Sequence, residues 1–516
     1  MLEVEELEKI LVLDFGAQYA HLICRRIREL GVYAELVPYD IPSDIILMKK
    51  AKGLILSGGP MSVLSRNAPL PDASIYKLGI PVLGICYGLQ IIVYQLGGKV
   101  IRSDKREYGK ATVSVKGEDR LFNGLGPDTV CWMSHGDAAE VLPPGFRSIA
   151  SSNNSPHAAI ASGRLYAVQF HPEVTHTPDG MTMLSNFAFD ICGCSRNWLA
   201  ENMIEDSVAK LKQTIGKNDK VICALSGGVD SSTTAAMLER AVGNRLFCVF
   251  VDTGLLREGE SERIEHAFRG MLRSNLIVVD ESNNFLRKLV GVKDPELKRK
   301  IVGREFIRAF GKVSRKIGKV KWLAQGTLYT DIVESAAARE RNQSKIKSHH
   351  NVGGLPKRMG FKLVEPLKDL YKDEVRKVAS KLGLPEEIVK SHPFPGPGLS
   401  VRIIGEITED KLRICRKSSA IVEKELVSAS LYDKVWQAFA FVGDDRATGV
   451  LGDERNMGYV VSVRMIESKD GMTADWYRPS PELLEKISNR ITNEVRGVTW
   501  VTYAISSKPP STIEPQ

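Results

Sequence analysis

Short apolar runs alternate with amphipathic stretches in the first part of the chain. Residues 10–15, 53–57 and 81–85 are apolar runs that predict buried strands, and residues 18–30 repeat apolar positions at helical spacing. Buried strands that alternate with helices are typical of a mostly parallel sheet with helices on its faces. We expect this first α/β unit to be complete near Cys194.

A second alternating unit follows a helical stretch that we interpret as a bridge between domains. Its pattern again favours a parallel sheet, and loops at the carboxyl ends of such strands are the usual place for active sites. The bridge is residues 198–217, and the predicted strands and helices after it are residues 221–225, 230–242, 246–251, 320–324 and 372–382.

The pattern changes at residues 392–398, where three prolines and two glycines cannot continue a helix or a central strand. A small mixed unit follows, with strands predicted at residues 401–404, 459–466 and 498–505 and helices at residues 409–426 and 481–495. The sequence therefore predicts two parallel-sheet domains and a small α+β domain, which span residues 1–197, 198–391 and 392–516.

The composition is consistent with this organisation, and it limits the compartment and the partners that we expect. A chain of 516 residues is too long for one core, and it contains no apolar run long enough to span a bilayer. The acidic N-terminus does not resemble a signal peptide, so we expect a cytoplasmic protein without membrane partners. The formal charge of +9 suits anionic partners, but a basic solvated surface is favoured over nucleic-acid binding because Lys and Arg form no long block.

The eight cysteines do not form a metal or redox motif. They include no C-x-x-C pair, so zinc-ribbon and thioredoxin interpretations fail. Cys223 and Cys248 lie in apolar runs and are predicted to be buried and inert. Cys86 differs, because it lies between a predicted strand and a predicted helix, with Gly84 and Gly88 on either side. This arrangement predicts a nucleophile elbow with cysteine as the nucleophile.

A base for this cysteine is predicted from a second segment. His171 and Glu173 follow the predicted strand at residues 164–170. His171 could take the thiol proton and Glu173 could orient the imidazole, so Cys86, His171 and Glu173 form a candidate catalytic triad.

The segments 84–88 and 169–173 resemble the class I (triad-type) glutamine amidotransferases. The resemblance implies that Cys86 attacks the amide carbon of glutamine and releases ammonia. It implies oxyanion donors at the backbone N–H groups of Gly59 and Tyr87. It also implies a set of residues that hold glutamine, namely Gln90, Ser134, His135 and Asp137. For His135 and Asp137 a plain polar turn is the alternative interpretation.

A second candidate site lies in the loop at residues 225–232, between a predicted strand and helix. Its glycines let backbone N–H groups approach phosphate oxygens, and the helix N-terminus favours negative charge. No Gly-Lys pair in the chain fits a Walker A loop. The loop resembles the pyrophosphate loop of the N-type ATP pyrophosphatases, with an adenine nucleotide α-hydrolase-like fold. The implied ATP ligands are Ser226, Gly227, Gly228, Val229, Asp230, Ser231, Ser232 and Val251. Mg²⁺ is expected with ATP, with Asp230 as the candidate ligand.

Further segments at 252–257, 322–327, 345–356, 392–399 and 506–514 resemble the GMP synthetase family in family order. The resemblance covers nearly the whole chain and implies amination of xanthosine 5′-monophosphate (XMP), with glutamine and ATP as the other substrates, and a homodimer formed through the last domain. It implies a lid that contains Asp331, Glu334, Lys347, Lys372 and Asp373. The implied XMP ligands are Arg304, Gln437, Lys508, Ile513 and Glu514. An RNA-modifying enzyme with the same loop is the rival interpretation, and a catalytically silent binder is a third.

The tail departs from that family pattern. Trp500 stands where the family has Arg, Ala504 where it has Asp, and Thr330 where it has Pro. The chain ends Glu514-Pro515-Gln516 rather than Glu-Trp-Glu. The missing Arg puts one expected phosphate contact in doubt, but Lys508 is retained.

Overall fold

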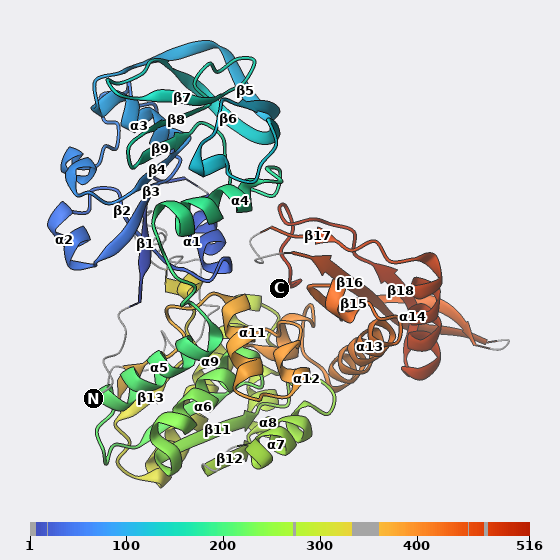
Figure 1. Ribbon diagram of the computed structural model, residues 1–516. Coiled ribbons are helices and arrows are strands. Elements are labelled where there is room, and N and C mark those ends of the chain that lie inside the picture. The colour runs from blue at the N-terminus through green and yellow to red at the C-terminus, as the bar shows by residue number, and fades with distance from the viewer. Residues whose placement is uncertain (1–6, 18, 272–274, 333–360, 452–453, 469–472) are drawn as a thin grey trace. The chain divides into compact units, whose positions relative to one another are not determined.

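The computed structural model describes residues 7–17, 19–271, 275–332, 361–451, 454–468 and 473–516 (Figure 1). The chain divides into two compact units, Met1–Asn202 and Met203–Gln516, which are described separately. Helix α5 (Ala200–Thr214) starts in the first unit and continues into the second. Among the described helices none is both long enough and apolar enough to cross a membrane.

The described part of the first unit contains a nine-stranded sheet in the order β2-β1-β3-β4-β9-β8-β7-β5-β6. Its strands are β1 (Lys9–Asp14), β2 (Tyr33–Pro38), β3 (Ala51–Leu56), β4 (Val82–Ile85), β5 (Lys99–Val115), β6 (Asp128–Val141), β7 (Arg147–Ser151), β8 (Ala159–Ser162) and β9 (Leu165–Val168). Its helices are α1 (Ala20–Glu29), α2 (Ser43–Met48), α3 (Tyr87–Gln95), α4 (Gly180–Ser185) and a π-helix (Asn186–Ile191).

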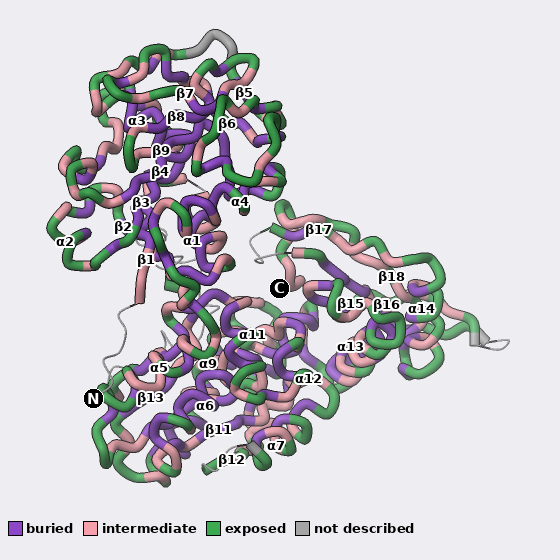
Figure 2. The backbone as a smooth tube through the Cα atoms, viewed as in Figure 1, coloured by how far each residue is buried: buried purple, intermediate pink, exposed green. Residues whose placement is uncertain are grey.

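The apolar run in β1 is continuous because both faces of this strand are covered. Ile10 and Val12 belong to the core that includes residues of α1, and Leu11 and Leu13 belong to the core that includes residues of α2 and α3. Figure 2 shows these central strands as buried. The register of β1, β3, β4 and β9 is parallel, so their carboxyl ends meet at one edge of the sheet. The predicted α/β fold of this unit is therefore confirmed.

The expectation of a mostly parallel sheet needs a correction. The strands β2, β1, β3, β4 and β9 pair in parallel, but β8, β7, β5 and β6 continue the sheet with antiparallel pairing. The physical reason lies in burial, since exposed and buried residues alternate along much of β6. Antiparallel sheets can leave one face in water, whereas parallel strands need both faces covered.

The second unit contains two sheets among its described residues. The first is a parallel five-stranded sheet in the order β12-β11-β10-β13-β14, and the second contains β15, β16, β17 and β18. The strands are β10 (Val221–Leu225), β11 (Leu246–Asp252), β12 (Asn275–Asp280), β13 (Trp322–Ala324), β14 (Lys362–Val364), β15 (Gln437–Leu451), β16 (Glu454–Glu467), β17 (Asp475–Trp476) and β18 (Val498–Tyr503). The helices are α6 (Val229–Val242), α7 (Glu260–Met271), α8 (Ser282–Leu289), α9 (Pro295–Ile317), α11 (Lys372–Lys381), α12 (Glu386–Val389), α13 (Glu409–Ser428) and α14 (Pro481–Glu494).

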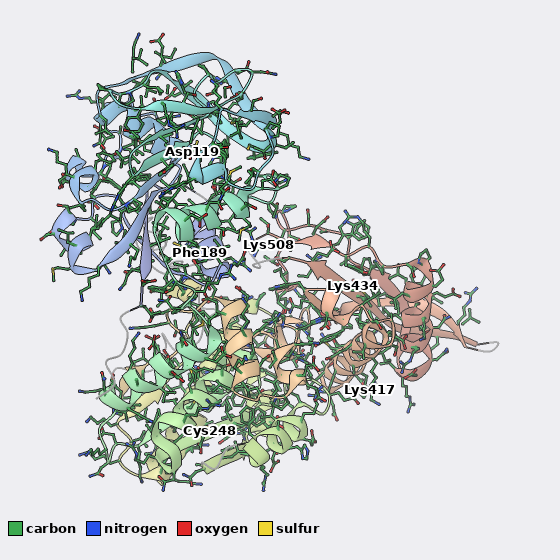
Figure 3. All side chains as sticks on the ribbon, in the orientation of Figure 1. Asp119, Phe189, Cys248, Lys417, Lys434 and Lys508 are labelled. Carbon is green, nitrogen blue, oxygen red and sulfur yellow. The ribbon has the colours of Figure 1, made fainter. Side chains whose placement is uncertain are left out.

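One core joins the two sheets of the second unit. It contains Ile222 and Val249 from the parallel sheet together with Val461 and Ile487 from the C-terminal part. The predicted boundary after residue 391 therefore falls inside a compact unit, and the division into three domains stays a prediction. Cys248, labelled in Figure 3, is buried in β11, and Cys223 is buried beside it, as expected.

The strand predicted at residues 401–404 is wrong. The chain forms a 3₁₀ turn at Gly398–Val401, and Ile403 makes only an isolated bridge to Val442. Gly398 adopts a φ of 63°, and a Cβ there would lie 2.5 Å from the carbonyl oxygen of Leu255. A close approach between two backbones at a left-handed residue thus replaces the strand that the β-branched residues suggested.

Candidate active sites

Cys86 lies on a strained turn between β4 and α3. Its φ of 53° and ψ of −99° are unusual for a residue with a side chain, and α3 begins at the next residue. A Cβ at Gly84 would lie 2.6 Å from the carbonyl carbon of Gly88, and one at Gly88 would lie 2.4 Å from the backbone oxygen of Leu56. The two glycines therefore permit the close packing of strand and helix around the turn. Backbone strain of this kind is typical of a nucleophile held at a functional site.

His171 and Glu173 complete the predicted triad. The Nδ1 atom of His171 is 2.7 Å from Oε1 of Glu173, and both side chains are buried. Burial opposes the charged imidazole, but hydrogen bonds to Cys86 and Glu173 outweigh burial and raise the pKa of His171. The ring of Tyr19 meets the imidazole edge-on, with 5.5 Å between the ring centres. The arrangement therefore favours a protonated imidazole beside Cys86, oriented by Glu173.

The candidate oxyanion segment lies against the same turn. Gly58 and Gly59 follow β3, whose carboxyl end neighbours that of β4. A Cβ at Gly58 would lie 3.3 Å from Cε1 of His171, and one at Gly59 would lie 2.9 Å from Cδ1 of Tyr87. The N–H of Tyr87 is at the first position of α3, where helices leave backbone donors without helical partners. Gly59 thus lies against Tyr87, the residue that follows Cys86, and the role of the two N–H groups as oxyanion donors stays a prediction.

The four candidate glutamine ligands also converge on this turn. The Cys86 thiol donates to the carbonyl oxygen of Ser134 across 3.6 Å, and Nε2 of Gln90 donates to that of Asp137 across 3.1 Å. His135 uses Nδ1 toward the Asp137 carbonyl, and burial lowers the pKa of His135 despite the carboxylate of Glu107. His135 and Asp137 thus lie in β6 and not in a plain polar turn, and their role in holding glutamine stays a prediction.

Sequence reasoning missed three residues of this site. Glu107 lies 3.1 Å from Nε2 of His135 and accepts a hydrogen bond from Ser152, and Ser62 donates to the carboxylate of Asp137. Gln169 places Nε2 3.8 Å from the sulfur of Cys86. Glu107 could not be found from local spacing, because its partners depend on the pairing of β5 with β6. Gln169 stands inside the motif that was used to identify His171.

The phosphate loop has the predicted strand–loop–helix geometry. β10 ends at Leu225, α6 begins at Val229, and Gly227 adopts a φ of 77° between them. The hydroxyl of Ser231 accepts from the Ser226 N–H at 3.1 Å and donates to the carbonyl of Gly228. Serine side chains therefore brace the loop, while the first N–H groups of α6 point out of the helix end toward a potential anion. Val251 lies in β11, beside β10 in parallel register.

Asp230 and Lys372 form the charged pair of this site. The ammonium of Lys372 lies 2.7 and 2.6 Å from the two carboxylate oxygens of Asp230. Lys372 and Asp373 begin α11, and the Asp331 carboxylate accepts from the N–H of Leu328 at 2.9 Å. Two predicted lid residues, Glu334 and Lys347, lie outside the described residues. The Lys372 ammonium thus balances the charge of the Asp230 carboxylate at the loop.

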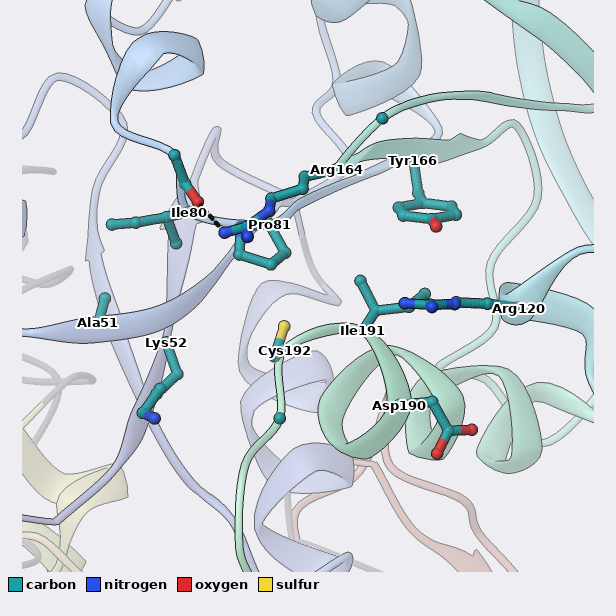
Figure 4. A pocket seen from close by; sticks show the side chains of 13 residues that line it. Ala51, Lys52, Ile80, Pro81, Arg120, Arg164, Tyr166, Asp190, Ile191 and Cys192 are labelled. Atoms are coloured by element: carbon teal, nitrogen blue, oxygen red, sulfur yellow. Dashed lines mark hydrogen bonds between the residues drawn. The ribbon is translucent and has the colours of Figure 1, made fainter.

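A hollow of about 460 Å³ in the first unit is a third feature, and its lining does not include Cys86, His171 or Glu173 (Figure 4). It is lined by residues at the starts of β3, β4 and β9, whereas Cys86 follows the carboxyl end of β4. Lys52, Arg120 and Asp190 line it with exposed side chains, and Arg164 donates to the carbonyl of Gly79 at 2.6 Å. It contains none of the predicted site residues, so its size does not make it the active site.

Known proteins resemble the chain over nearly its whole length. Residues 11–191 match the family described as Glutamine amidotransferase class-I, and residues 424–515 match the one described as GMP synthase C terminal domain. The chain is 54% identical to GMP synthase (glutamine-hydrolyzing) of Heliobacterium modesticaldum and 52% identical to those of Carboxydothermus hydrogenoformans and Aquifex aeolicus. Each of these alignments covers 98% of this chain and 99% of the relative. The chain belongs to the family of glutamine-hydrolyzing GMP synthases.

One solved structure is similar to part of this GMP synthase family member. It is a putative GMP synthase subunit from Thermoplasma acidophilum, 34% identical, and the match covers 36% of this chain and 94% of that one. The TM-score is 0.32.

Three of the five candidate XMP ligands expected for a GMP synthase lie together in the C-terminal part. Gln437 is 2% exposed, and its Nε2 donates to Oε1 of Glu514 at 2.8 Å. Arg402 binds both carboxylate oxygens of Glu514, at 3.0 and 2.9 Å, and Arg464 donates to the carbonyl of Ile513. Arg402 and Arg464 were missed by the sequence analysis. They fix the tail against β15 and β16.

The other two candidates are placed differently. Arg304 lies on α9, where its Nε is 3.3 Å from the carboxylate of Glu305. Lys508, labelled in Figure 3, exchanges two backbone hydrogen bonds with Ala474. The backbone of Lys508 is thus fixed independently of its ammonium group. Trp500, which replaces the expected Arg, is 54% exposed and donates to the carbonyl of Thr448.

Proposed function

We propose that this chain hydrolyses glutamine at Cys86 and uses the ammonia to convert XMP to GMP at the loop of residues 226–232. ATP is cleaved to AMP and pyrophosphate in the process. The observation that carries the proposal is that one chain holds both a strained cysteine beside a His171–Glu173 pair and an N-type pyrophosphate loop. Membership of the GMP synthase family supports the same pair of reactions.

At the first site, the Cys86 sulfur bonds to the amide carbon of glutamine, and the carbonyl oxygen takes the negative charge toward the N–H groups of Gly59 and Tyr87. His171 then donates its proton to the leaving nitrogen, the C–N bond breaks, and ammonia departs. Water attacks the thioester, His171 takes a proton from it, and glutamate leaves with the sulfur restored as thiolate. Glu173 holds the imidazole in the orientation that both proton transfers need.

At the second site, a carbonyl oxygen of XMP attacks the α-phosphorus of ATP and pyrophosphate leaves. Ammonia then adds to the activated carbon, and AMP departs with the oxygen. The backbone N–H groups at the start of α6 bind and orient the pyrophosphate portion. Lys372 lies at the loop and can neutralise charge that develops on the leaving group.

Mg²⁺ fits the donor set of the loop. Mg²⁺ commonly uses one or two carboxylates together with substrate phosphates rather than an all-protein cage. Asp230 supplies one carboxylate, and Mg²⁺ would take the place of the Lys372 ammonium beside its oxygens. We propose that Asp230 and the ATP phosphates hold Mg²⁺, which supplies charge neutralisation for phosphate transfer.

Pyrophosphate release distinguishes this function from RNA modification. ATP and ammonium should be offered to the full chain with XMP, with IMP or with tRNA, and pyrophosphate should be measured. We expect release that depends on XMP. Release that depends on tRNA and not on XMP would favour the rival enzyme class.

Substitution of Lys508 tests whether the C-terminal segment contributes to XMP binding. A nucleotide monophosphate is close to dianionic near neutral pH, so loss of a nearby fixed cation weakens binding. Because Trp500 stands where the family has Arg, fewer cations remain and Lys508 should matter more. We expect Lys508→Ala to raise KM for XMP by at least about tenfold, or roughly 1.4 kcal/mol. The measurement varies XMP at saturating ATP and ammonium.

The matched control is Lys434→Ala, which removes an exposed lysine from the same unit and should leave KM for XMP unchanged. Trp500→Arg should tighten XMP binding or leave it as it is. An unaltered KM for XMP in Lys508→Ala would remove the tail from the XMP site.

We further propose a cytoplasmic homodimer with three domains at the predicted boundaries. Eight free thiols support a reducing compartment. Exposed apolar side chains in the C-terminal part support an interface there, because a second copy would remove them from water. They include Val450, Met457, Trp500 and Ile505.

A further inference from the structure

Gln169 is a buried amide whose position calls for an explanation. It follows β9, it is 0% exposed, and its backbone N–H donates to the carbonyl of Ala158 at 2.8 Å. Its Nε2 lies 3.8 Å from the sulfur of Cys86. Its Oε1 is buried and has no hydrogen-bond partner among the described residues. Burying an amide whose acceptor stays unpaired costs free energy, so a purely apolar residue of similar shape would serve packing better.

This free-energy cost is offset if the N–H group of Gln169 donates a hydrogen bond to a negatively charged sulfur. A thiol is a weak acceptor, and an N–H gains little from it. A thiolate is an anion, and hydrogen bonds to ionised groups are roughly twice as strong as neutral ones. The contact between Gln169 and Cys86 therefore strengthens when the sulfur loses its proton to His171, and it favours the reactive state of the nucleophile.

We propose that Gln169 is a positioning residue that donates a hydrogen bond to the Cys86 thiolate and holds the sulfur ready for attack. The proposal rests on the assignment of Cys86 as the glutaminase nucleophile. An amide suits this task because it donates a hydrogen bond without competing with His171 for the proton. The same N–H group stabilises the thiolate again when it leaves as the thioester is hydrolysed.

The test is the rate at which iodoacetamide alkylates Cys86 in the full chain between about pH 5 and pH 9, because only the thiolate reacts. Cys86→Ala gives the background from the other thiols. Gln169→Met keeps an unbranched side chain without the donor. We expect its alkylation rate at neutral pH to fall about tenfold and its half-maximal rate to move to higher pH, with an equal fall in glutaminase kcat and an unchanged KM for glutamine.

The variants leave the other titratable groups at the site in place, and these include His171, Glu173, Asp137 and the His135–Glu107 pair. Gln169→Glu is the second variant, with nearly the same shape and a negative charge in place of the donor, and it should shift the profile further. Gln95→Met is the matched control, since Gln95 is a part-buried amide of α3 that donates to Pro71 instead. It should alkylate like the parent chain.

The proposal would be overturned if kcat falls in both Gln169 variants while the pH dependence of Cys86 alkylation stays the same. Gln169 would then serve packing alone. Should Gln169→Met fail to fold, Gln169→Glu decides the matter. Failure of the underlying assignment has a different signature, because Cys86→Ala would then retain glutamine-dependent turnover whatever Gln169 does.

Discussion

Cys86→Ala should abolish glutamine-dependent GMP formation while ammonium still supports it. The substitution removes the sulfur that bonds to the amide carbon, and loss of a nucleophile that acts as a unit with its base typically costs at least about a thousandfold in kcat. The loop of residues 226–232 belongs to the other compact unit, so adenylation of XMP does not depend on the thiol. The measurement compares GMP formation with saturating glutamine and with saturating ammonium.

Alanine is a suitable replacement because it keeps a Cβ at the strained φ of Cys86 and leaves the packing of Gly84 against Gly88 unchanged. Cys131→Ala is the control, since Cys131 is a fully buried thiol of β6 in the same unit. It should retain glutamine-dependent activity. Substantial glutamine-driven turnover in Cys86→Ala would exclude Cys86 as the nucleophile.

Asp230→Asn should depress GMP formation with either nitrogen source by at least about a hundredfold, because a metal ion at a phosphate-transfer centre contributes several kcal/mol and we propose that Asp230 holds it. The amide keeps the shape of the side chain but leaves the ammonium of Lys372 without its ion-pair partner. Glutamine hydrolysis measured as glutamate release should continue, because that site is in the first unit. Pyrophosphate release from ATP in the presence of XMP is the direct measurement.

Asp410→Asn provides the control for that experiment. Asp410 is an exposed carboxylate on α13 that pairs with Arg413, and its neutralisation should leave pyrophosphate release unchanged. Unchanged pyrophosphate release in Asp230→Asn would contradict the assignment of this loop to ATP.

The elements that carry the sites could be predicted because their signals are local. β10 was expected at residues 221–225 and lies there, and α6 begins one residue before its predicted start. Strand, turn and helix follow each other within a few residues at Cys86 and at Ser226. Glycines mark both turns, because backbone must approach backbone or phosphate there. Such motifs can therefore be identified from a few consecutive residues.

Contacts that depend on distant pairing could not be predicted. Glu107 meets His135 only because β5 and β6 pair, and Arg402 meets Glu514, which lies 112 residues later in the chain. The antiparallel strands were missed because their alternating pattern is weaker than that of a fully buried strand. The strand expected at residues 401–404 failed because the left-handed turn at Gly398 outweighs local strand preference.

The coupling of the two reactions in one chain is tested most directly with amide-¹⁵N glutamine. The full chain should be incubated with labelled glutamine, ATP, Mg²⁺ and XMP, and the GMP formed should be analysed by mass spectrometry together with AMP and pyrophosphate. We expect GMP that carries ¹⁵N in its 2-amino group, with AMP and pyrophosphate formed in equal amounts to GMP. Labelled ammonia without labelled GMP, or GMP formed without pyrophosphate, would contradict the proposed function.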